Sequence, residues 1–277
     1  MITISSISTV YTHSGVFHAD DVACVALLHM LGFCGNVERV RNAPDIIRSD
    51  EIVIDIGGIY NGHNRFDHHQ PDCPVRDDGV KYASFGLLVK DLGICNEPGF
   101  ETFDAFFAEG IDARDNGQWD LAKDHPSPIG NIVSVFNPTW DSGVSEDEAF
   151  DEAVAMVRRI LEKEFARRRS AINADDTVRK ALDEGEDGII VLPKFMPWKD
   201  TLKRVGNVLG DGSVLKGAAF ISRGEWVIFL LNGYQFPLEW NANPPKFVKF
   251  CHAAGFMVSA ETLEDILEAA RFIKEVV

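Results

Sequence analysis

The sequence predicts an α/β protein of two domains, in which a long helix joins an N-terminal parallel-sheet domain to a smaller C-terminal α/β domain. At 277 residues the chain is long for one domain and comfortable for two. Residues 145–182 contain neither Pro nor Gly, which is typical of one long helix or of two abutting ones. Strand and helix patterns alternate before this stretch, and short β-rich runs follow it. We therefore expect domains at 1–145 and 186–277, with a helical connector at 146–185.

The first elements are a short strand and a helix. The run Ser8-Thr9-Val10-Tyr11-Thr12 is rich in β-branched residues, which favour strands. Asp20 or Asp21 is a candidate N-cap, and apolar residues at helical spacing follow it. Gly32 ends the predicted helix after Leu31.

Two more strands and a second helix complete the predicted sheet. The strands cover residues 37–41 and 51–56, and the helix covers 82–92 before Gly93. Strands that alternate with helices imply a parallel sheet with helices packed on its faces. Sites in such folds form beyond the carboxyl ends of the strands.

The C-terminal part predicts a second, smaller α/β domain. Its β-rich runs lie at residues 189–192, 215–222 and 226–231. A closing helix is predicted from Thr262 to Val277, with Ser259 or Thr262 as its cap.

Composition excludes several classes of protein. The formal net charge of −16 is opposite to the basic surface that binds long duplex DNA. No run approaches the roughly 20 apolar residues of a membrane span, and the N-terminus lacks the pattern of a signal peptide. The five cysteines form no Cys-x-x-Cys pair, which favours reduced thiols over a thiolate zinc site. We therefore expect a cytoplasmic protein without membrane partners.

Histidines and aspartates gather where the predicted strands end. The candidates are His13, His18, Asp20, Asp55, His68 and an aspartate near Ile111. Imidazole nitrogen together with carboxylate oxygen suits Mn²⁺, Mg²⁺, Fe²⁺ or Zn²⁺. Asp55, at the end of a central strand, can bridge two ions, and two ions roughly 3.5–4 Å apart suit phosphoester hydrolysis.

Each of these residues also has an ordinary structural interpretation. A histidine after a strand is commonly a hydrogen-bonded turn residue, Asp20 an N-cap and Asp67 a turn former. Three such clusters at the same predicted sheet edge favour a metal site over three unrelated turns.

Beyond these residues, the chain resembles the DHH phosphoesterase superfamily, and within it the MYG1 (UPF0160) family. The matching stretches are Thr12-His13-Ser14-Gly15-Val16-Phe17-His18-Ala19-Asp20-Asp21, Val53-Ile54-Asp55-Ile56-Gly57-Gly58-Ile59-Tyr60, Arg65-Phe66-Asp67-His68-His69-Gln70, Ile111-Asp112-Ala113-Arg114-Asp115-Asn116-Gly117, Phe136-Asn137-Pro138-Thr139-Trp140, Pro197-Trp198-Lys199 and His252-Ala253-Ala254-Gly255-Phe256. They span nearly the whole chain in the expected order.

The resemblance implies two domains, with a catalytic cleft between them and a centre of two divalent ions. Mn²⁺ is the first choice and Mg²⁺ the second. The implied metal ligands are His13, His18, Asp20, Asp55, His68 and Asp115, with Asp55 as the bridge. Asp112 is the alternative to Asp115, which we favour because Asp115-Asn116-Gly117 looks like the superfamily's Asp-Thr-Gly turn.

The resemblance also implies two phosphate-binding residues, His69 and His252, which with Asp55 form the implied catalytic set. Asp67 would support the histidines after it. The chain departs from the pattern at Phe250-Cys251, where related phosphodiesterases have glycines, and in the run His13-x4-His18-x-Asp20, where a histidine replaces one Asp of the usual first motif.

The resemblance predicts a metal-dependent phosphodiesterase, a 3′→5′ exonuclease on short single-stranded RNA or oligonucleotides. The residues themselves indicate only metal-assisted hydrolysis. A pyrophosphatase or small phosphoanhydride hydrolase is the second possibility, and a metal-binding regulatory protein without turnover is the third. A homo-oligomer is compatible with each of them.

Overall fold

The computed structural model describes residues 3–118, 120 and 128–276. The chain forms two compact units, Met1–Ala166 and Arg167–Val277. The division lies inside the long helix α5 (Glu146–Asn173), which α6 (Asp175–Asp183) follows directly. The expected run of helix at 145–182 is thus two abutting helices.

The sheet of the first unit is entirely parallel, which confirms the predicted fold class. Its strands are β1 (Thr9–His13), β2 (Asn36–Val40), β3 (Glu51–Ile54) and β4 (Arg65–Phe66), in the order β2-β1-β3-β4. The two-residue strand β4 is too short to be recognised from a hydrophobic pattern. It pairs with β3 and thereby brings the chain after Phe66 beside the end of β3.

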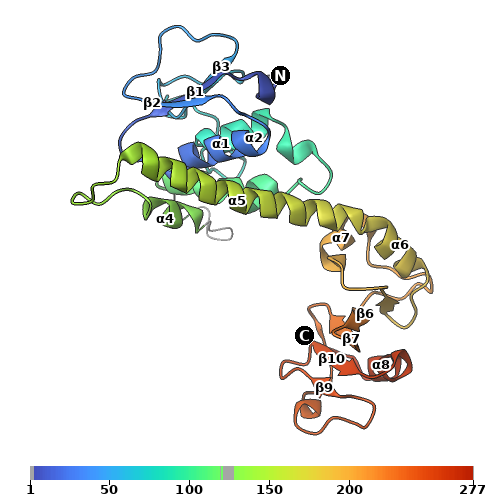
Figure 1. Ribbon diagram of the computed structural model, residues 1–277. Coiled ribbons are helices and arrows are strands. Elements are labelled where there is room, and N and C mark those ends of the chain that lie inside the picture. The colour runs from blue at the N-terminus through green and yellow to red at the C-terminus, as the bar shows by residue number, and fades with distance from the viewer. Residues whose placement is uncertain (1–2, 119, 121–127, 277) are drawn as a thin grey trace. The chain divides into compact units, whose positions relative to one another are not determined.

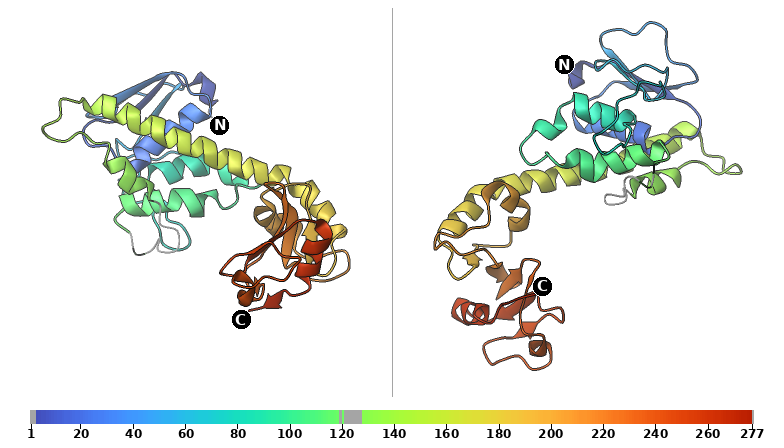
Figure 2. Two further views of the ribbon diagram at one scale, coloured as in Figure 1. Left: turned by 60° about the horizontal axis from the view of Figure 1, so that its bottom comes forward. Right: turned by 180° about the vertical axis from the view of Figure 1, so that it is seen from behind.

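Helices gather below this sheet in Figure 1, where α1 and α2 lie side by side on one face, as Figure 2 also shows from behind. The helices of the unit are α1 (Ala19–Met30), α2 (Ser84–Asp91), α3 (Glu109–Asp115), α4 (Ile129–Ser134) and the first part of α5, with short 3₁₀ turns at Ile4–Ser6 and Ile94–Asn96 and a π-helical turn at Asp104–Ala108. One apolar core joins them to the sheet, and it is rich in buried Phe side chains such as Phe85 and Phe103.

The N-cap of α1 differs from the predicted one. His18 is the cap residue, and Asp21 lies in the first turn, where its Oδ1 accepts the backbone N–H of His18 at 3.0 Å. A first-turn acidic residue that bonds back to the cap is a common arrangement, so the acidic pair marked the helix start but not the cap itself.

The second unit is built on a five-stranded sheet with its own core. Its strands are β5 (Ile189–Val191), β6 (Gly217–Ser222), β7 (Glu225–Leu230), β9 (Phe250–Cys251) and β10 (Met257–Ala260), in the order β5-β6-β7-β10-β9. Only the β5–β6 pair is parallel. The remaining elements are the end of α5, α6, α7 (Trp198–Val205), α8 (Leu263–Ala270), a 3₁₀ turn at Leu238–Asn241 and a small sheet of β8 (Tyr234–Gln235) and β11 (Lys274–Glu275).

The closing helix is shorter than predicted. Thr262 caps it through a hydrogen bond to the Asp265 N–H, as expected, but the helix ends at Ala270 rather than Val277. Phe272 packs on Trp240, with ring centroids 5.2 Å apart, and β11 then pairs with β8. Tertiary packing therefore overrides helix propensity in the last residues. None of the described helices combines the length and apolar character that crossing a membrane requires.

Candidate metal centre

The predicted ligands of the first unit meet at the carboxyl ends of its strands. His13 ends β1, Asp55 follows β3, and His68 and His69 follow β4. The other members come from helix ends: His18 and Asp20 at the start of α1, and Asp115 at the end of α3. The parallel register places these segments at one edge because every strand runs in the same direction.

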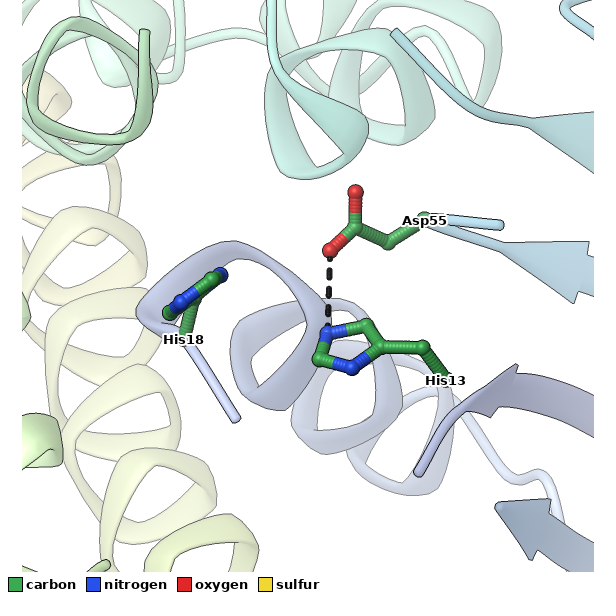
Figure 3. Close-up of side chains that lie close together, drawn as sticks. All are labelled: His13, His18 and Asp55. Atoms are coloured by element: carbon green, nitrogen blue, oxygen red, sulfur yellow. Dashed lines mark ion pairs between the residues drawn. The ribbon is translucent and has the colours of Figure 1, made fainter. Parts of the chain in front are cut away.

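Asp55 occupies the centre of the group. Its Oδ2 lies 3.3 Å from His13 Nε2, and its Oδ1 lies 3.2 Å from His68 Nε2. The dashed line in Figure 3 marks the ion pair with His13. Ser84 Oγ donates a hydrogen bond to the same Oδ1 at 3.1 Å. Burial opposes ionisation, but the contacts with His13 and His68 outweigh it and lower the pKa of Asp55. The two oxygens of one carboxylate thus face two different imidazoles.

His68 points into a group of carboxylates. Its Nε2 lies 2.9 Å from Asp115 Oδ2 and 3.8 Å from Asp20 Oδ2, in addition to the contact with Asp55. Burial lowers the pKa of His68, but the surrounding carboxylates, Asp115 first, raise it overall to about 11. In the metal-free protein, a protonated His68 ring therefore supplies the positive charge among these carboxylates.

The geometry separates the two candidate aspartates of α3. Asp112 Oδ2 accepts a hydrogen bond from Arg76 at 2.7 Å, and its Oδ1 accepts the Gly86 N–H at 3.0 Å. Asp112 is thereby committed to a buried ion pair, whereas Asp115 Oδ2 faces His68. The preference for Asp115 as the ligand accordingly has a physical basis in the partners that Asp112 already has.

His18 lies at the solvent side of the group. Its ring nitrogen Nδ1 is 3.6 Å from Asp115 Oδ1, and its side chain is 57% exposed. Ligand atoms of His13, His18 and Asp55 lie within 4.8 Å of one another, and the same holds for His18, Asp20 and Asp115. Figure 3 shows His18 across the start of α1 from the paired His13 and Asp55.

Asp67 holds the segment that carries both histidines of the tripeptide. Its Oδ1 accepts the His68 N–H at 2.7 Å and the His69 Nδ1–H at 2.7 Å, and its Oδ2 accepts the Gly58 N–H. The hydrogen bond to Asp67 raises the pKa of His69. With Nδ1 occupied, Nε2 of the largely exposed His69 is left to meet a ligand.

Three buried atoms of the group have no hydrogen-bond partner among the described residues: Asp20 Oδ1, Asp21 Oδ2 and His68 Nε2. Burial raises the pKa of Asp21 to about 7 and that of Asp20 well above its usual range. Uncompensated buried carboxylates are costly, and divalent cations would offset this charge. The donor set of imidazoles and carboxylates therefore fits hard or borderline divalent ions.

Two further residues join the group that sequence reasoning did not include as site residues. Ser84, the first residue of α2, is buried and contacts Asp55 through its hydroxyl and Asp20 through its N–H at 3.4 Å. Asp21 Oδ2 lies 3.3 Å from His13 Nε2. Asp21 was visible as half of an acidic pair, but Ser84 carries no local signal because both of its partners are distant in the sequence.

A hollow of about 220 Å³ borders the group. It is lined by Phe17, His18, Ala19, Ile111, Arg114, Asp115, Gly130 and Ser134. Two of these residues, His18 and Asp115, also belong to the metal-ligand candidates. A small ligand in this hollow would lie directly beside them.

His252 belongs to the second unit, in the turn between β9 and β10. Its Nδ1 accepts the Ala254 N–H at 3.1 Å, which leaves the proton of the neutral ring on Nε2. Gly255 in the same turn has a φ of +65°, and a Cβ there would lie 2.8 Å from the Phe236 carbonyl oxygen. The turn therefore requires this glycine. Phe250 and Cys251, at which the chain departs from the glycines of related phosphodiesterases, form strand β9.

Comparison with known proteins gives relatives over most of the chain. The model of a family described as "Uncharacterised protein family (UPF0160)" matches residues 9–228. A MYG1 protein of Schizosaccharomyces pombe is 27% identical, with 97% of this chain and 98% of the relative covered. The MYG1 exonuclease of Mus musculus is 28% identical, with 94% of this chain and 83% of the relative covered.

Solved structures with some likeness include RecJ from Thermus thermophilus in complex with Mg²⁺. Its sequence identity is 14% and its TM-score 0.29, over 97% of this chain and 50% of that one. The exonuclease RecJ bound to manganese has the same identity and a TM-score of 0.28, over 95% of this chain and 88% of that one.

Proposed function

The chain belongs to the protein family UPF0160, and from that membership and the geometry of the site we propose that it is a metal-dependent phosphodiesterase. We propose further that it is a 3′→5′ exonuclease on short single-stranded RNA or other oligonucleotides. The name "MYG1 exonuclease", which relatives from Mus musculus and Homo sapiens carry, supports the nuclease activity.

The arrangement of Asp55 between two imidazoles is the observation that carries the proposal. Oδ2 faces His13 and Oδ1 faces His68, so one carboxylate can serve two ions at once. In the proposal, His13, His18 and Asp55 hold one ion. Asp20, Asp55, His68 and Asp115 hold the other. The mixed nitrogen and oxygen donors favour Mn²⁺, with Mg²⁺ as the second choice.

When bound, two divalent ions would lower the pKa of a water and stabilise the charge that develops on a phosphoester. The chain's own residues then position the substrate. His69, held through Nδ1 by Asp67, would donate from Nε2 to a phosphoryl oxygen. The raised pKa of His69 favours the doubly protonated ring, which can make both hydrogen bonds.

His252 would be a second donor to the substrate phosphate. Its tautomer supports that role, since Nδ1 accepts the Ala254 N–H and Nε2 carries the proton. The Ala254 N–H orients the ring, and the Gly255 N–H bonds to the His252 carbonyl oxygen at 2.8 Å within the same turn.

The size of the hollow and the charge of the chain support a small anionic substrate. The hollow of about 220 Å³ begins at His18 and Asp115 and includes Arg114 as its cation. With a formal net charge of −16, the chain would attract a phosphate through bound ions and not through its general surface. The cytoplasmic location and any homo-oligomer stay predictions.

The proposal is tested by an activity screen of the full chain after EDTA treatment, with Mn²⁺ or Mg²⁺ added back. Substrates are short single-stranded RNA and DNA labelled at either end, a cyclic dinucleotide and pyrophosphate. We expect stepwise shortening from the 3′ end of the single strands. Turnover of pyrophosphate alone would contradict the nuclease and favour the phosphoanhydride hydrolase.

A matched pair of variants ties activity to the centre. Asp55→Asn keeps the shape of the side chain but removes the charge that would bridge the ions. Asn also tolerates the positive φ of this position. Asp112→Asn alters an equally buried aspartate that faces Arg76. We expect the first variant to lose ion binding and activity together, while the second keeps both. Ion binding without turnover on any substrate would favour a regulatory metal-binding protein.

A further inference from the structure

Asp21 is a buried carboxylate that the proposed ligand set leaves without a role. Its side chain is 0% exposed, and its two oxygens have different surroundings. Oδ1 accepts the backbone N–H groups of His18 at 3.0 Å and Val22 at 2.7 Å. Oδ2 lies 3.3 Å from His13 Nε2 and has no hydrogen-bond partner among the described residues.

Capping of helix α1 accounts for only one of these oxygens. The cap needs an acceptor for the His18 N–H, and Oδ1 meets that need. An exposed carboxylate would turn its second oxygen to water, but here Oδ2 is enclosed. The nearest positive group is the His13 ring, and a buried carboxylate oxygen without a hydrogen bond is costly unless a cation faces it.

The distances around His13 fit such a cation. Nε2 of His13 is 3.3 Å from Asp21 Oδ2 and equally 3.3 Å from Asp55 Oδ2. Two adjacent ligands of an octahedral ion, each about 2.1 Å from it, lie about 3 Å apart. Both distances from His13 Nε2 are therefore close to the separation of two adjacent ligands of one ion.

We propose that Asp21 Oδ2 is a ligand of the divalent ion that His13 and Asp55 hold. This inference rests on the proposed two-ion centre and adds a residue to it. Each ion then has its own aspartate from the first turn of α1, Asp21 for the ion at His13 and Asp20 for the ion at His68. The bridging Asp55 serves both.

The assignment changes the charge at the first ion. With His13, His18 and Asp55 alone, that ion would have two neutral imidazoles and half of a shared carboxylate. Asp21 adds a full negative charge to this ligand set. We therefore expect the ion at His13 to depend on Asp21 for much of its affinity.

The test is a titration of EDTA-treated full chain with Mn²⁺, in which electron paramagnetic resonance measures the free ion. Wild type should bind two equivalents. Asp21→Asn retains an oxygen for the cap but loses the charge, so one equivalent should weaken by at least about tenfold while the other is unchanged. Unfolding of the metal-free variant by urea checks that the cap and the fold are intact.

Two controls make the outcome specific. Asp112→Asn changes a second fully buried aspartate of the same unit and should leave both equivalents as in wild type. If Asp21→Asn does not fold, Asp21→Glu and Asp21→Gln replace it, since both keep a first-turn acceptor and differ only in charge. The Glu variant should then bind the ion at His13 more tightly than the Gln variant does.

The results separate this inference from the proposed function. Two unchanged equivalents in Asp21→Asn, or equal binding by the Glu and Gln variants, would overturn the role of Asp21 and leave the two-ion centre standing. Wild type that binds no Mn²⁺ would overturn both.

Discussion

Asp55 holds a backbone conformation that side chains other than glycine seldom adopt. Its φ of +56° lies in the left-handed region, which costs on the order of 1 kcal/mol for an ordinary residue. That conformation lets the chain turn directly at the end of β3 while both carboxylate oxygens stay inside the group. Strain of this kind persists where surrounding contacts determine it, and here these contacts come from His13, His68 and Ser84.

Asp67 should matter for turnover more than for ion binding. Asp67→Asn would remove the negative charge that faces His69 Nδ1 and so lower the pKa of His69, without altering a proposed ligand. We expect kcat to fall about 10- to 100-fold while two equivalents of Mn²⁺ still bind. Steady-state kinetics and Mn²⁺ titration measure the two effects.

His69→Gln serves as the companion variant of Asp67→Asn. If Asp67 acts through His69, the double variant should be no slower than His69→Gln alone. A fully additive loss would show that Asp67 acts by another route.

The metal-free protein should lose stability as the pH rises. In the folded protein the pKa of His13 is raised from 6.5 to about 9, because its contacts with Asp55 and Asp21 outweigh burial. Between these two values the folded state holds a proton that the unfolded state has released, so stability falls as the pH increases. The raised pKa values of Asp20 and Asp21 act in the same direction.

His68, with its pKa raised to about 11, adds a second proton over the same range, so the expected slope in EDTA is about 2–3 kcal/mol per pH unit between about pH 7 and 9, from urea unfolding at a series of pH values. Bound Mn²⁺ would replace the protons, so the slope should be smaller in its presence. A slope of the opposite sign in EDTA would show that His13 is not protonated in the folded state.

At the scale of the elements, the sequence predicts the strands that have a clear local pattern of hydrophobic residues. The strands that end at His13 and Asp55 have clear hydrophobic runs, so the edge at which their side chains meet followed from the parallel topology. Strand β4 is too short for such a pattern. Ser84 joins the site only through contacts with Asp55 and Asp20, which are distant in the sequence and which one sequence does not reveal.

The loop between β1 and α1 is held from outside the candidate centre. Asn137 Oδ1 accepts the Phe17 N–H at 3.0 Å, and Asn137 Nδ2 donates to the Phe17 carbonyl oxygen at 3.0 Å. Arg39, on β2, donates to the Gly15 carbonyl oxygen. These contacts satisfy the loop backbone and fix the approach to His18.

The two hydrogen bonds from Asn137 to Phe17 clamp this loop. Their removal should weaken ion binding, although no proposed ligand is changed. Asn137→Ala leaves both backbone groups of Phe17 without these partners, so we expect a loss of about 1–3 kcal/mol in unfolding free energy. Mn²⁺ affinity should fall about tenfold, since supporting residues commonly have effects of that size. Urea unfolding and Mn²⁺ titration measure the two quantities.

Thr139→Ala is the control for Asn137→Ala, because its hydroxyl bonds to Asp141 within the same loop and not to the β1–α1 loop. It should leave Mn²⁺ affinity unchanged. Equal losses of affinity in both variants would mean that the whole loop, and not the Asn137 clamp, supports the site.

At the scale of the whole molecule, the main apolar core of the first unit is separate from the two apolar cores of the second. The core of the first unit runs from Ile7 to Phe165, and those of the second lie between Ala174 and Ala269. All proposed ion ligands belong to the first unit, whereas His252 belongs to the second. Ion binding should therefore stabilise one unit in particular.

Calorimetry of the full chain should show this as two unfolding transitions, of which only one responds to Mn²⁺. A ligand present at about 100 times its Kd adds about 2.7 kcal/mol to the stability of the unit that binds it, which raises the Tm of that transition by several degrees. The Asp55→Asn variant, which changes the carboxylate shared by both ions, should lose most of this shift and leave the other transition in place. A single transition that moves as a whole with Mn²⁺ would show that the two units unfold cooperatively, and no shift in either transition would contradict the metal centre itself.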